Sequence, residues 1–280
     1  MSMNLDARQR AMLLEMGVRV WQPQAPSHVA PTGSSPDPEP HAAAVLEVPK
    51  SDPVAAPLTV PSQVVVPAPV VHAAAIVAGP STNTLDWEGL QTAVSACQAC
   101  GLCQSRRHTV FGAGAAPARW LIVGEAPGEQ EDAQGQPFVG PAGQLLDNML
   151  KAVGLSRGGD VFITNVLKCR PPANRNPQPE EMAQCAPFLQ RQIELVQPTV
   201  ILALGRFAAQ SLLQSSLPEV ATTPLGKLRG QVHSYQNGSA GLHLPVVVSY
   251  HPAYLLRAPA DKAKAWADWC LALATAPHPH

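Results

Sequence analysis

The stretch Trp120-Leu-Ile-Val-Gly-Glu-Ala-Pro-Gly-Glu-Gln-Glu-Asp132 joins a short apolar run to a turn and then to a group of acids and amides. Four apolar residues that run into a Gly/Pro turn are typical of a buried strand, which we place at 120–123. Similar runs at 161–163, 199–204 and 245–249 predict three more strands. Their apolar residues are continuous and do not alternate with polar ones, which indicates a parallel sheet covered on both faces.

Helices are predicted around these strands. Apolar residues at helical spacing occur over 144–153, 180–196, 205–213 and 260–274, and also before the first strand from Trp87 onward. Pro187 is expected to kink or split the helix at 180–196, because proline lacks a backbone donor. Alternating strands and helices predict an α/β fold in which helices cover both faces of a parallel sheet.

The N-terminal part of the chain has a different composition. Thirteen of the 30 prolines precede residue 86, and the stretch 22–80 consists largely of Pro, Ala, Val and Ser. Because proline removes backbone donors, we expect a disordered linker at 22–85, with an edge strand at its valine runs as the alternative. The apolar spacing within 1–21 predicts a short helix that could dock on a protein partner. The globular domain is then expected at 86–280.

Charge and targeting signals exclude several classes of protein. The chain carries 19 Lys and Arg against 20 Asp and Glu, and the part from Asp86 onward has fifteen against fourteen. This balance excludes a strongly basic nucleic-acid binder. Any DNA contact must come from local clusters, namely Arg106-Arg107-His108, Lys168-Arg170-Arg175 and Lys227-Arg229. The first helix carries acids, unlike a secretory signal, and no apolar run has the length of a membrane span. We therefore expect a cytoplasmic monomer.

The six cysteines favour metal ligation, because disulfides are unfavourable in a reducing cytosol. Four of them form two pairs, which are Cys97 with Cys100 and Cys169 with Cys185. Four thiolates close either a tetrahedral zinc site or a cubane iron–sulfur cluster, and the spacing does not choose between them. Cys103 continues the even spacing of the first pair, so one cysteine of that group is surplus. Cys270 lies in an apolar helix and is expected to be a buried small hydrophobic residue.

Polar or aromatic residues follow the ends of the predicted strands. The acids after 120–123 suit a base or a water-orienting group, and they equally fit a plain helix start. Phe138 lies in a Gly/Pro-bounded loop and could stack on a base, while the amide of Asn165 could donate to and accept from a pyrimidine edge. His251 has a restrained backbone because Pro252 follows it. Each residue alone is a weak signal, but the carboxyl ends of parallel strands meet at one edge, so together they predict a ligand pocket.

With these motifs in place, residues 86–257 resemble the iron–sulfur (family 4) uracil-DNA glycosylases. Four motifs carry the resemblance in the order of the family: Gly124-Glu-Ala-Pro-Gly128, Pro137-Phe-Val-Gly140, Thr164-Asn-x-x-Lys-Cys-Arg-Pro-Pro-x-Asn-Arg175 and His251-Pro-Ala-Tyr-Leu-Leu256. The resemblance implies a four-stranded parallel sheet in a three-layer αβα sandwich. It also implies a [4Fe–4S] cluster held by Cys97, Cys100, Cys169 and Cys185, which leaves Cys103 spare.

The resemblance further implies a DNA-repair hydrolase that flips uracil out of single- or double-stranded DNA, cleaves its N-glycosidic bond and leaves an abasic site. Phe138 would stack on the flipped uracil, and Asn165 would bind its N3 and O4 edge. His251 would donate to O2, and Glu125 would place the water or stabilise the sugar cation, with Glu131 close by. The other substrate-binding positions implied by the resemblance are Gly124, Ala126 and Asn174.

The chain departs from the best-known uracil glycosylases at two positions of the first motif. Those enzymes have an aspartate where this chain has Ala126, and a thymine-excluding tyrosine where it has Gly128, which is a pattern that fits family 4. The general base is therefore not at position 126. A DNA-trapping branch carries a basic insertion with a histidine, and the stretch 225–230 has none, so trapping is not expected.

Two other functions fit the sequence less well. A non-catalytic iron–sulfur or zinc module that binds DNA or a polymerase would not need Phe138, Asn165 and His251 together. A zinc-stabilised small-molecule hydrolase fits the fold, but the sequence has no identifiable nucleophile elbow. Release of uracil from DNA in the presence of EDTA would separate the glycosylase from both alternatives.

Overall fold

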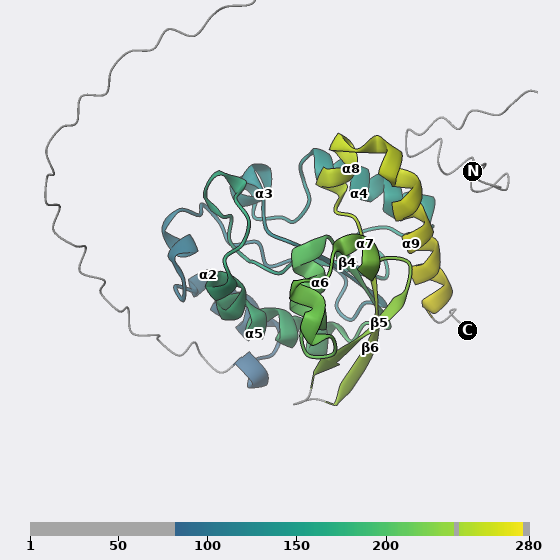
Figure 1. The fold of residues 1–280 in the computed structure, drawn as a ribbon. Helices are drawn as coiled ribbons and strands as arrows, with labels where there is room; N and C mark the ends of the chain where they lie inside the picture. The colour runs from purple at the N-terminus through teal and green to yellow at the C-terminus, as the bar shows by residue number, and fades with distance from the viewer. Residues whose placement is uncertain (1–81, 238–240, 277–280) are drawn as a thin grey trace, which may run out of the picture. The chain divides into compact units, whose positions relative to one another are not determined.

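The computed structural model of the protein describes residues 82–237 and 241–276. Within them, the chain forms one six-stranded sheet in the order β1-β3-β2-β4-β6-β5. Figure 1 shows the fold as a ribbon. Its strands are β1 (Ala113–Gly114), β2 (Trp120–Gly124), β3 (Val161–Asn165), β4 (Val200–Leu204), β5 (Val232–Asn237) and β6 (Leu242–Ser249). The four inner strands are parallel, and both edge strands are antiparallel to their neighbours. The carboxyl ends of the four parallel strands therefore meet on one side of the sheet.

Helices of the described chain connect and cover these strands. They are α2 (Trp87–Ala96), α3 (Glu129–Gln134), α4 (Pro141–Ala152), α5 (Pro179–Val196), α6 (Arg206–Leu213), α7 (Leu225–Leu228), α8 (Pro252–Arg257) and α9 (Lys262–Thr275). Short 3₁₀ turns lie at η1 (Thr82–Thr84), η2 (Gly101–Gln104), η3 (Pro172–Asn174), η4 (Pro218–Ala221) and η5 (Pro259–Asp261).

Side chains of the parallel strands alternate between two hydrophobic cores. Leu121 and Val123 of β2 face the core that α5 and α6 cover. Trp120 and Ile122 of the same strand face the second core, which α4 and α9 cover. All four side chains are at most 2% exposed. Burial on both faces confirms the predicted three-layer α/β arrangement.

The sheet differs from the prediction in its number of strands. Four strands were predicted, and the described chain has six. The four predicted strands are the parallel ones, and the two extra strands lie at the edges. The strand β1 has only two residues. The strand β5 has the sequence Val-His-Ser-Tyr-Gln-Asn, and its Val232 is 46% exposed. Neither strand therefore has a continuous apolar run. An edge strand takes its place from backbone pairing with a neighbour, which leaves little trace in the sequence.

Two local features of the helices also differ from the prediction. Of the two alternatives at Pro187, the split is wrong, because α5 continues through Pro187 as one helix. The helix α8 was not predicted. It begins at Pro252, which suits the first helical position, and His251 caps it.

The described chain begins before the expected domain boundary at residue 86. Thr82 is 4% exposed, and its hydroxyl donates to the main-chain oxygen of Pro187 in α5 at 3.3 Å. The helix expected within 1–21 and the linker expected at 22–85, up to Ser81, lie outside the described residues. No helix in the described ranges combines the length and apolarity needed to cross a membrane.

Candidate active site and cysteine centre

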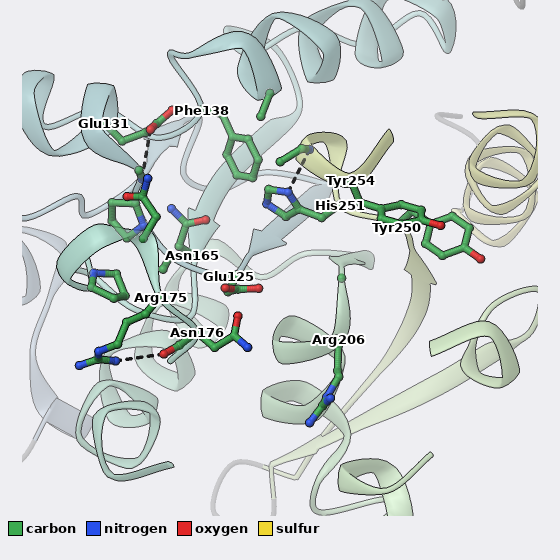
Figure 2. Close-up of a pocket in the computed structure, with 18 of the residues that line it drawn as sticks. Glu125, Glu131, Phe138, Asn165, Arg175, Asn176, Arg206, Tyr250, His251 and Tyr254 are labelled. Atoms are coloured by element: carbon green, nitrogen blue, oxygen red, sulfur yellow. Dashed lines mark hydrogen bonds between the residues drawn. The ribbon is translucent and has the colours of Figure 1, made fainter. Parts of the chain in front are cut away.

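A cavity of about 610 Å³ opens where the parallel strands end (Figure 2). It is lined by seven of the predicted site residues, namely Glu125, Ala126, Glu131, Phe138, Asn165, Asn174 and His251. These residues come from four separate motifs, and the register of the sheet brings the motifs together. Figure 2 shows Phe138, Asn165, Glu125 and His251 around one common space. A cavity of this size holds a small aromatic ring such as a nucleobase.

Gly124 lies behind the cavity wall, where it pairs with Asn165 of β3. A Cβ atom at position 124 would lie 2.5 Å from the ring Cζ of Phe138 and closer still to the side-chain oxygen of Asn165. Any side chain here would displace both groups, so the glycine is required for close approach. This explains why a predicted substrate-binding position does not itself line the cavity.

Asn165 presents an unpaired polar atom to the cavity. The residue is 2% exposed, and its side-chain oxygen Oδ1 is buried without a hydrogen-bond partner in the described chain. Leaving such an acceptor unpaired costs about 1–3 kcal/mol. Its main-chain oxygen accepts a hydrogen bond from Nζ of Lys168 at 2.6 Å, which holds the backbone in place. The residue is therefore arranged to accept a hydrogen bond from a ligand.

Phe138 has an unusual backbone conformation for a bulky residue. Its φ of 54° lies in the left-handed region, which costs a non-glycine residue about 1–2 kcal/mol. Its ring lies 5.4 Å from the His251 ring between centroids, with 29° between the two planes. Strained residues of this kind concentrate at functional sites. The ring gives the cavity a flat apolar face beside the carboxamide of Asn165.

His251 is held as a neutral hydrogen-bond donor. Its Nδ1 accepts from the backbone N–H of Ala253 at 3.2 Å, which places the ring hydrogen on Nε2. Burial lowers the pKa of His251 to about 4; the positive charge of Arg257 lowers it further and Glu131 opposes the shift. At neutral pH the side chain therefore offers an uncharged N–H to the cavity.

The two predicted acids lie in different environments. Glu125 is half-buried in the cavity wall, and this burial raises the pKa of its carboxyl above the ordinary value. Glu131 has both oxygens occupied by backbone donors. Its Oε1 accepts from Val139 and Gly140 at 2.9 and 3.0 Å, and its Oε2 accepts from Gly128 at 3.1 Å. Glu125 is thus available to a ligand, whereas Glu131 holds the chain around it.

The loop that carries Asn174 is tied to the start of α5. Arg175 makes a forked ion pair with Glu181, at 2.9 and 2.5 Å. Asn174 has a φ of 53°, and its side-chain oxygen accepts from Nε of Arg170 at 2.7 Å. The neighbouring Asn176 also lines the cavity. The paired charges fix this loop as part of the cavity wall.

Further lining residues were not predicted. They include Asn176, Arg206, Tyr250, Tyr254 and Arg257. Tyr254 lies inside the fourth motif and Tyr250 directly precedes it, so their positions were a usable signal. On the rim, Tyr254 is 36% exposed, and Leu256, in the same helix, is 45% exposed. Arg206 begins α6, and no sequence pattern singled it out.

Three cations of the basic clusters predicted to contact DNA lie against the interior. Lys168 is 2% exposed, so it cannot reach DNA. Arg106 donates to Sγ of Cys169 at 3.2 Å, and Arg229 pairs with the buried Asp268 at 2.8 Å. These three cations are engaged with the interior. The cations that line the cavity are Arg175, Arg206 and Arg257.

A second, much smaller cavity of about 10 Å³ lies among the cysteines. It is lined by Cys97, Cys100, Cys103, Cys169 and Cys185. Burial raises the pKa of Cys185 to about 12, against an opposing hydrogen bond from the backbone of Lys168. Burial also raises the pKa of Cys169, which Arg106 opposes. Such thiols become thiolates when a cation compensates their charge, so this donor set fits zinc or an iron–sulfur cluster.

Two further observations concern the cysteines. In 82–237 and 241–276, no group of three or more His, Cys, Asp or Glu side chains is already arranged to hold a metal ion. Cys270 lies apart from the cavity, half-buried against the core between the sheet, α4 and α9.

Residues 111–270 match the family model of the uracil DNA glycosylase superfamily. A type-4 uracil-DNA glycosylase from Archaeoglobus fulgidus is 45% identical over 166 residues, which cover 59% of this chain and 81% of that protein. One from Pyrobaculum aerophilum is 44% identical over 176 residues, or 63% and 87% of the two chains. The chain belongs to the type-4 uracil-DNA glycosylases.

A type-5 uracil-DNA glycosylase from Thermus thermophilus is less similar, at 34% identity over 161 residues, or 51% of this chain and 68% of that one. The matches confirm the family resemblance drawn from the four motifs. The type-4 enzymes are the iron–sulfur family, which agrees with the cysteine-lined cavity. The roles of the individual residues follow from the geometry of the site.

Proposed function

We propose that the protein removes uracil from DNA by hydrolysing the bond between the base and its deoxyribose, and leaves an abasic site for base excision repair. The observation that carries this proposal is the buried, unpaired Oδ1 of Asn165 beside the Phe138 ring. Uracil has a donor at N3 and an acceptor at O4, and one carboxamide pairs with both. Cytosine has the reverse pattern, so it would leave buried polar groups unpaired.

The uracil reaches this cavity by leaving the base stack. Extrusion costs a few kcal/mol, and stacking on an aromatic ring returns about 1–3 kcal/mol per base. Phe138 supplies that ring. Leu256 is exposed in the same helix as Tyr254, which lines the cavity, and its apolar side chain suits insertion into the gap that the uracil leaves. Single-stranded and duplex DNA are both substrates, since the cavity contacts the extruded base.

The chemical step uses groups on opposite sides of the base. Nε2–H of His251 donates to uracil O2 while the electron pair of the C1′–N1 bond moves onto the base. A donor aimed at developing charge is worth about 10²–10³ in rate. Glu125 accepts a proton from the water whose oxygen bonds to C1′, and its negative charge stabilises the cationic sugar. Glu131 acts as a positioning residue through its three backbone hydrogen bonds.

The cysteine centre holds a [4Fe–4S] cluster through Cys97, Cys100, Cys169 and Cys185, with Cys103 spare. Support comes from the single cavity that these cysteines line and from the iron–sulfur family of the chain. When bound, the cluster supplies the positive charge that buried thiolates need. Arg106 donates to Cys169, and the backbone of Lys168 donates to Cys185, as partners of ligand sulfurs usually do.

The function is tested by incubating the purified protein in EDTA with single- and double-stranded oligonucleotides that contain one uracil. We expect free uracil and an alkali-labile site in both. The matched oligonucleotides with cytosine or thymine should stay intact. DNA binding without uracil release would contradict the proposal and favour a non-catalytic module.

The cofactor is tested separately by measuring iron, inorganic sulfide and zinc after anaerobic purification. Cys169→Ser should lose the visible absorbance of the cluster and much of the soluble protein. Cys270→Ser, the matched control outside the cysteine cavity, should lose neither. Stoichiometric zinc without iron would contradict the cluster assignment.

A further inference from the structure

We propose that Arg157 is a positioning residue that sets the direction of the Phe138 ring, and through it the hold on the extruded base. This inference rests on the proposed function of the cavity. Arg157 lies between α4 and β3, outside all four motifs, and it does not line the cavity. It acts on the reaction through the backbone of the loop that carries Phe138.

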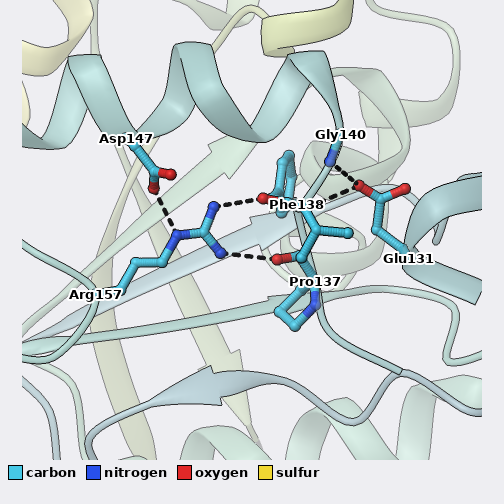
Figure 3. Close-up of polar contacts among 7 residues, drawn as sticks. Glu131, Pro137, Phe138, Gly140, Asp147 and Arg157 are labelled. Atoms are coloured by element: carbon cyan, nitrogen blue, oxygen red, sulfur yellow. Dashed lines mark hydrogen bonds and ion pairs between the residues drawn. The ribbon is translucent and has the colours of Figure 1, made fainter. Parts of the chain in front are cut away.

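Each nitrogen of the Arg157 guanidinium donates one hydrogen bond, either to this loop or to α4 (Figure 3). One terminal nitrogen donates to the main-chain oxygen of Pro137 at 2.8 Å, and the other donates to that of Phe138 at 2.5 Å. The Nε donates to Asp147 of α4 at 2.5 Å, which orients the fork. A planar fork with charge-assisted hydrogen bonds fixes two carbonyls with defined geometry.

Glu131 holds the same loop from the other side. Its Oε1 accepts from the N–H of Val139, which is the far end of the peptide whose oxygen Arg157 binds. That peptide is thus held at both its C=O and its N–H. The preceding peptide is held at the oxygen of Pro137. Both peptide planes that meet at the Cα of Phe138 are therefore fixed, and they determine its φ, its ψ and the direction of its Cα–Cβ bond.

The conformation held in this way is one that phenylalanine does not adopt by preference. The φ of 54° lies in the small left-handed region, where a bulky side chain is uncommon. The helix α4 packs close against the loop, since a Cβ at Gly143 would collide with the main-chain oxygen of Phe138. Without the fork of Arg157, the peptide is free to relax toward the right-handed or extended region, which turns the ring away from Asn165.

The inference is tested with Arg157→Met, which removes every donor and keeps an apolar stem. We expect single-turnover excision of uracil from a U·A duplex to fall about tenfold, in the range of coupling between contacting residues. The loss should be smaller on single-stranded DNA, because extrusion there depends less on stacking. Arg157→Lys should recover part of the rate, and Asp147→Asn should show a weaker loss of the same pattern.

The matched control is Arg119→Met. Arg119 also pairs with an aspartate, Asp160, at 3.5 Å, and its side chain is 32% exposed against 27% for Arg157. Excision should change by less than about twofold, as for most surface substitutions. Thermal unfolding and visible absorbance are measured for every variant.

A double substitution separates positioning from a structural role. Phe138→Ala removes the ring that Arg157 directs, so adding Arg157→Met should cost less than about twofold more. Losses that are equal in both backgrounds would overturn the inference. So would equal losses on single- and double-stranded DNA together with a lower Tm. A failure of the proposed function is distinguishable, because the unsubstituted protein would then release no uracil.

Discussion

The two sides of the cavity are built differently. The first, which we call the reading wall, consists of Glu125 and Asn165 at the ends of β2 and β3, and of Phe138 in the loop between α3 and α4. The second, the open wall, consists of Arg206, His251 and Tyr254 beyond β4 and β6. Phe138 and Asn165 are 5% and 2% exposed, and Arg157, Glu131 and Lys168 hold their backbones. The His251 ring is oriented by one backbone hydrogen bond and by its stacking on Phe138. Tyr254 is 36% exposed, and its hydroxyl donates to Asp261 at 2.6 Å.

Selection of the base and contact with the DNA strand are thus divided between the two walls. Groups that distinguish one base from another must be fixed before the base arrives, because a mobile amide would adapt to cytosine as well as to uracil. Groups that meet the strand gain from exposure, because the strand varies in shape. We therefore expect a change at Asn165 in the reading wall to alter the choice of base, and changes in the open wall to alter rate or strand dependence without altering that choice.

The largest effect is expected for Asn165→Asp. The carboxylate has no donor for uracil O4, and it repels the negative charge that develops on the leaving uracil. Single-turnover excision of uracil should therefore fall by about 10⁴, as it does in sites that lose a required hydrogen-bond pattern. A protonated carboxyl offers a different pattern, and slight activity on cytosine is the expected side effect. Both rates are measured on matched oligonucleotides.

The contrasting variant is His251→Ala in the open wall. It should slow excision by about 10² and leave the ratio of uracil to cytosine unchanged, because His251 acts on leaving-group charge. Wild-type uracil rates for Asn165→Asp would remove its base-reading role. A changed base ratio for His251→Ala would break the division between the walls.

Glu125→Gln tests the chemistry of the reading wall through pH. Burial raises the pKa of Glu125, so the rate of the unsubstituted enzyme should fall as pH drops through a value above that of an ordinary glutamate. The variant should be slower by about 10² at neutral pH and should lack this acid limb. Single-turnover rates between pH 4 and 8 give both results. The lower limit of this range is set at about 4 because that is the pKa of His251.

The same substitution has a predictable effect on stability. A carboxyl whose pKa is raised by folding binds its proton more tightly in the folded state, so ionisation at neutral pH destabilises the fold. Glu125→Gln should therefore unfold at an equal or higher temperature than the unsubstituted protein.

An unchanged acid limb in the pH–rate profile of the variant would assign the titration to another group.

Leu256→Ser tests the exposed face of α8, the helix that follows His251 of the open wall, and its expected effect is smaller. Its side chain is 45% exposed in the helix that His251 caps, so its removal should not disturb the core. Excision from a U·A duplex should fall about tenfold, since a wedge that fills the stack is worth a few kcal/mol at most. Excision from single strands should be nearly unchanged. An equal loss on both substrates would show that Leu256 supports the fold and does not enter the stack.

The smallest effect is expected for removal of residues 1–80. Every described residue that lines the cavity lies after Gly124, so neither wall loses a group. A chain that begins at Ser81 should excise uracil from short oligonucleotides within about twofold of the full-length rate, as expected of changes away from the site. A large fall in single-turnover rate would show that the N-terminal part contributes to the cavity.

The sequence predicted the parallel strands and the cavity residues because both leave local signals. Apolar runs mark β2, β3, β4 and β6, and the polar side chains of Glu125, Asn165 and His251 lie at or just after the ends of β2, β3 and β6. The edge strand β5 left no such signal, since of its residues only Tyr235 is buried. The start of α8 did leave one, because His251-Pro252 fits an N-cap and a first helical position, but we used it only as a backbone restraint.

Arg157 shows what the sequence could not supply. Its partners in the loop are main-chain oxygens, which every residue possesses, so no pairing of side-chain types connects positions 157 and 138. Lys168 was misplaced for a related reason. A lysine followed closely by two arginines suggests a surface patch, whereas three internal oxygens, those of Thr164, Asn165 and Gln192, satisfy its ammonium group in the interior.

Gly124 determines where the enzyme could be redesigned for another base. Adding even one carbon there would intrude on both Phe138 and Asn165, so bulk cannot be introduced at position 124. A variant for a larger or differently substituted base must instead gain its space by trimming a side chain that already faces the cavity. The absence of a side chain at position 124 thus contributes to the selectivity of the enzyme, because it leaves Phe138 and Asn165 in place.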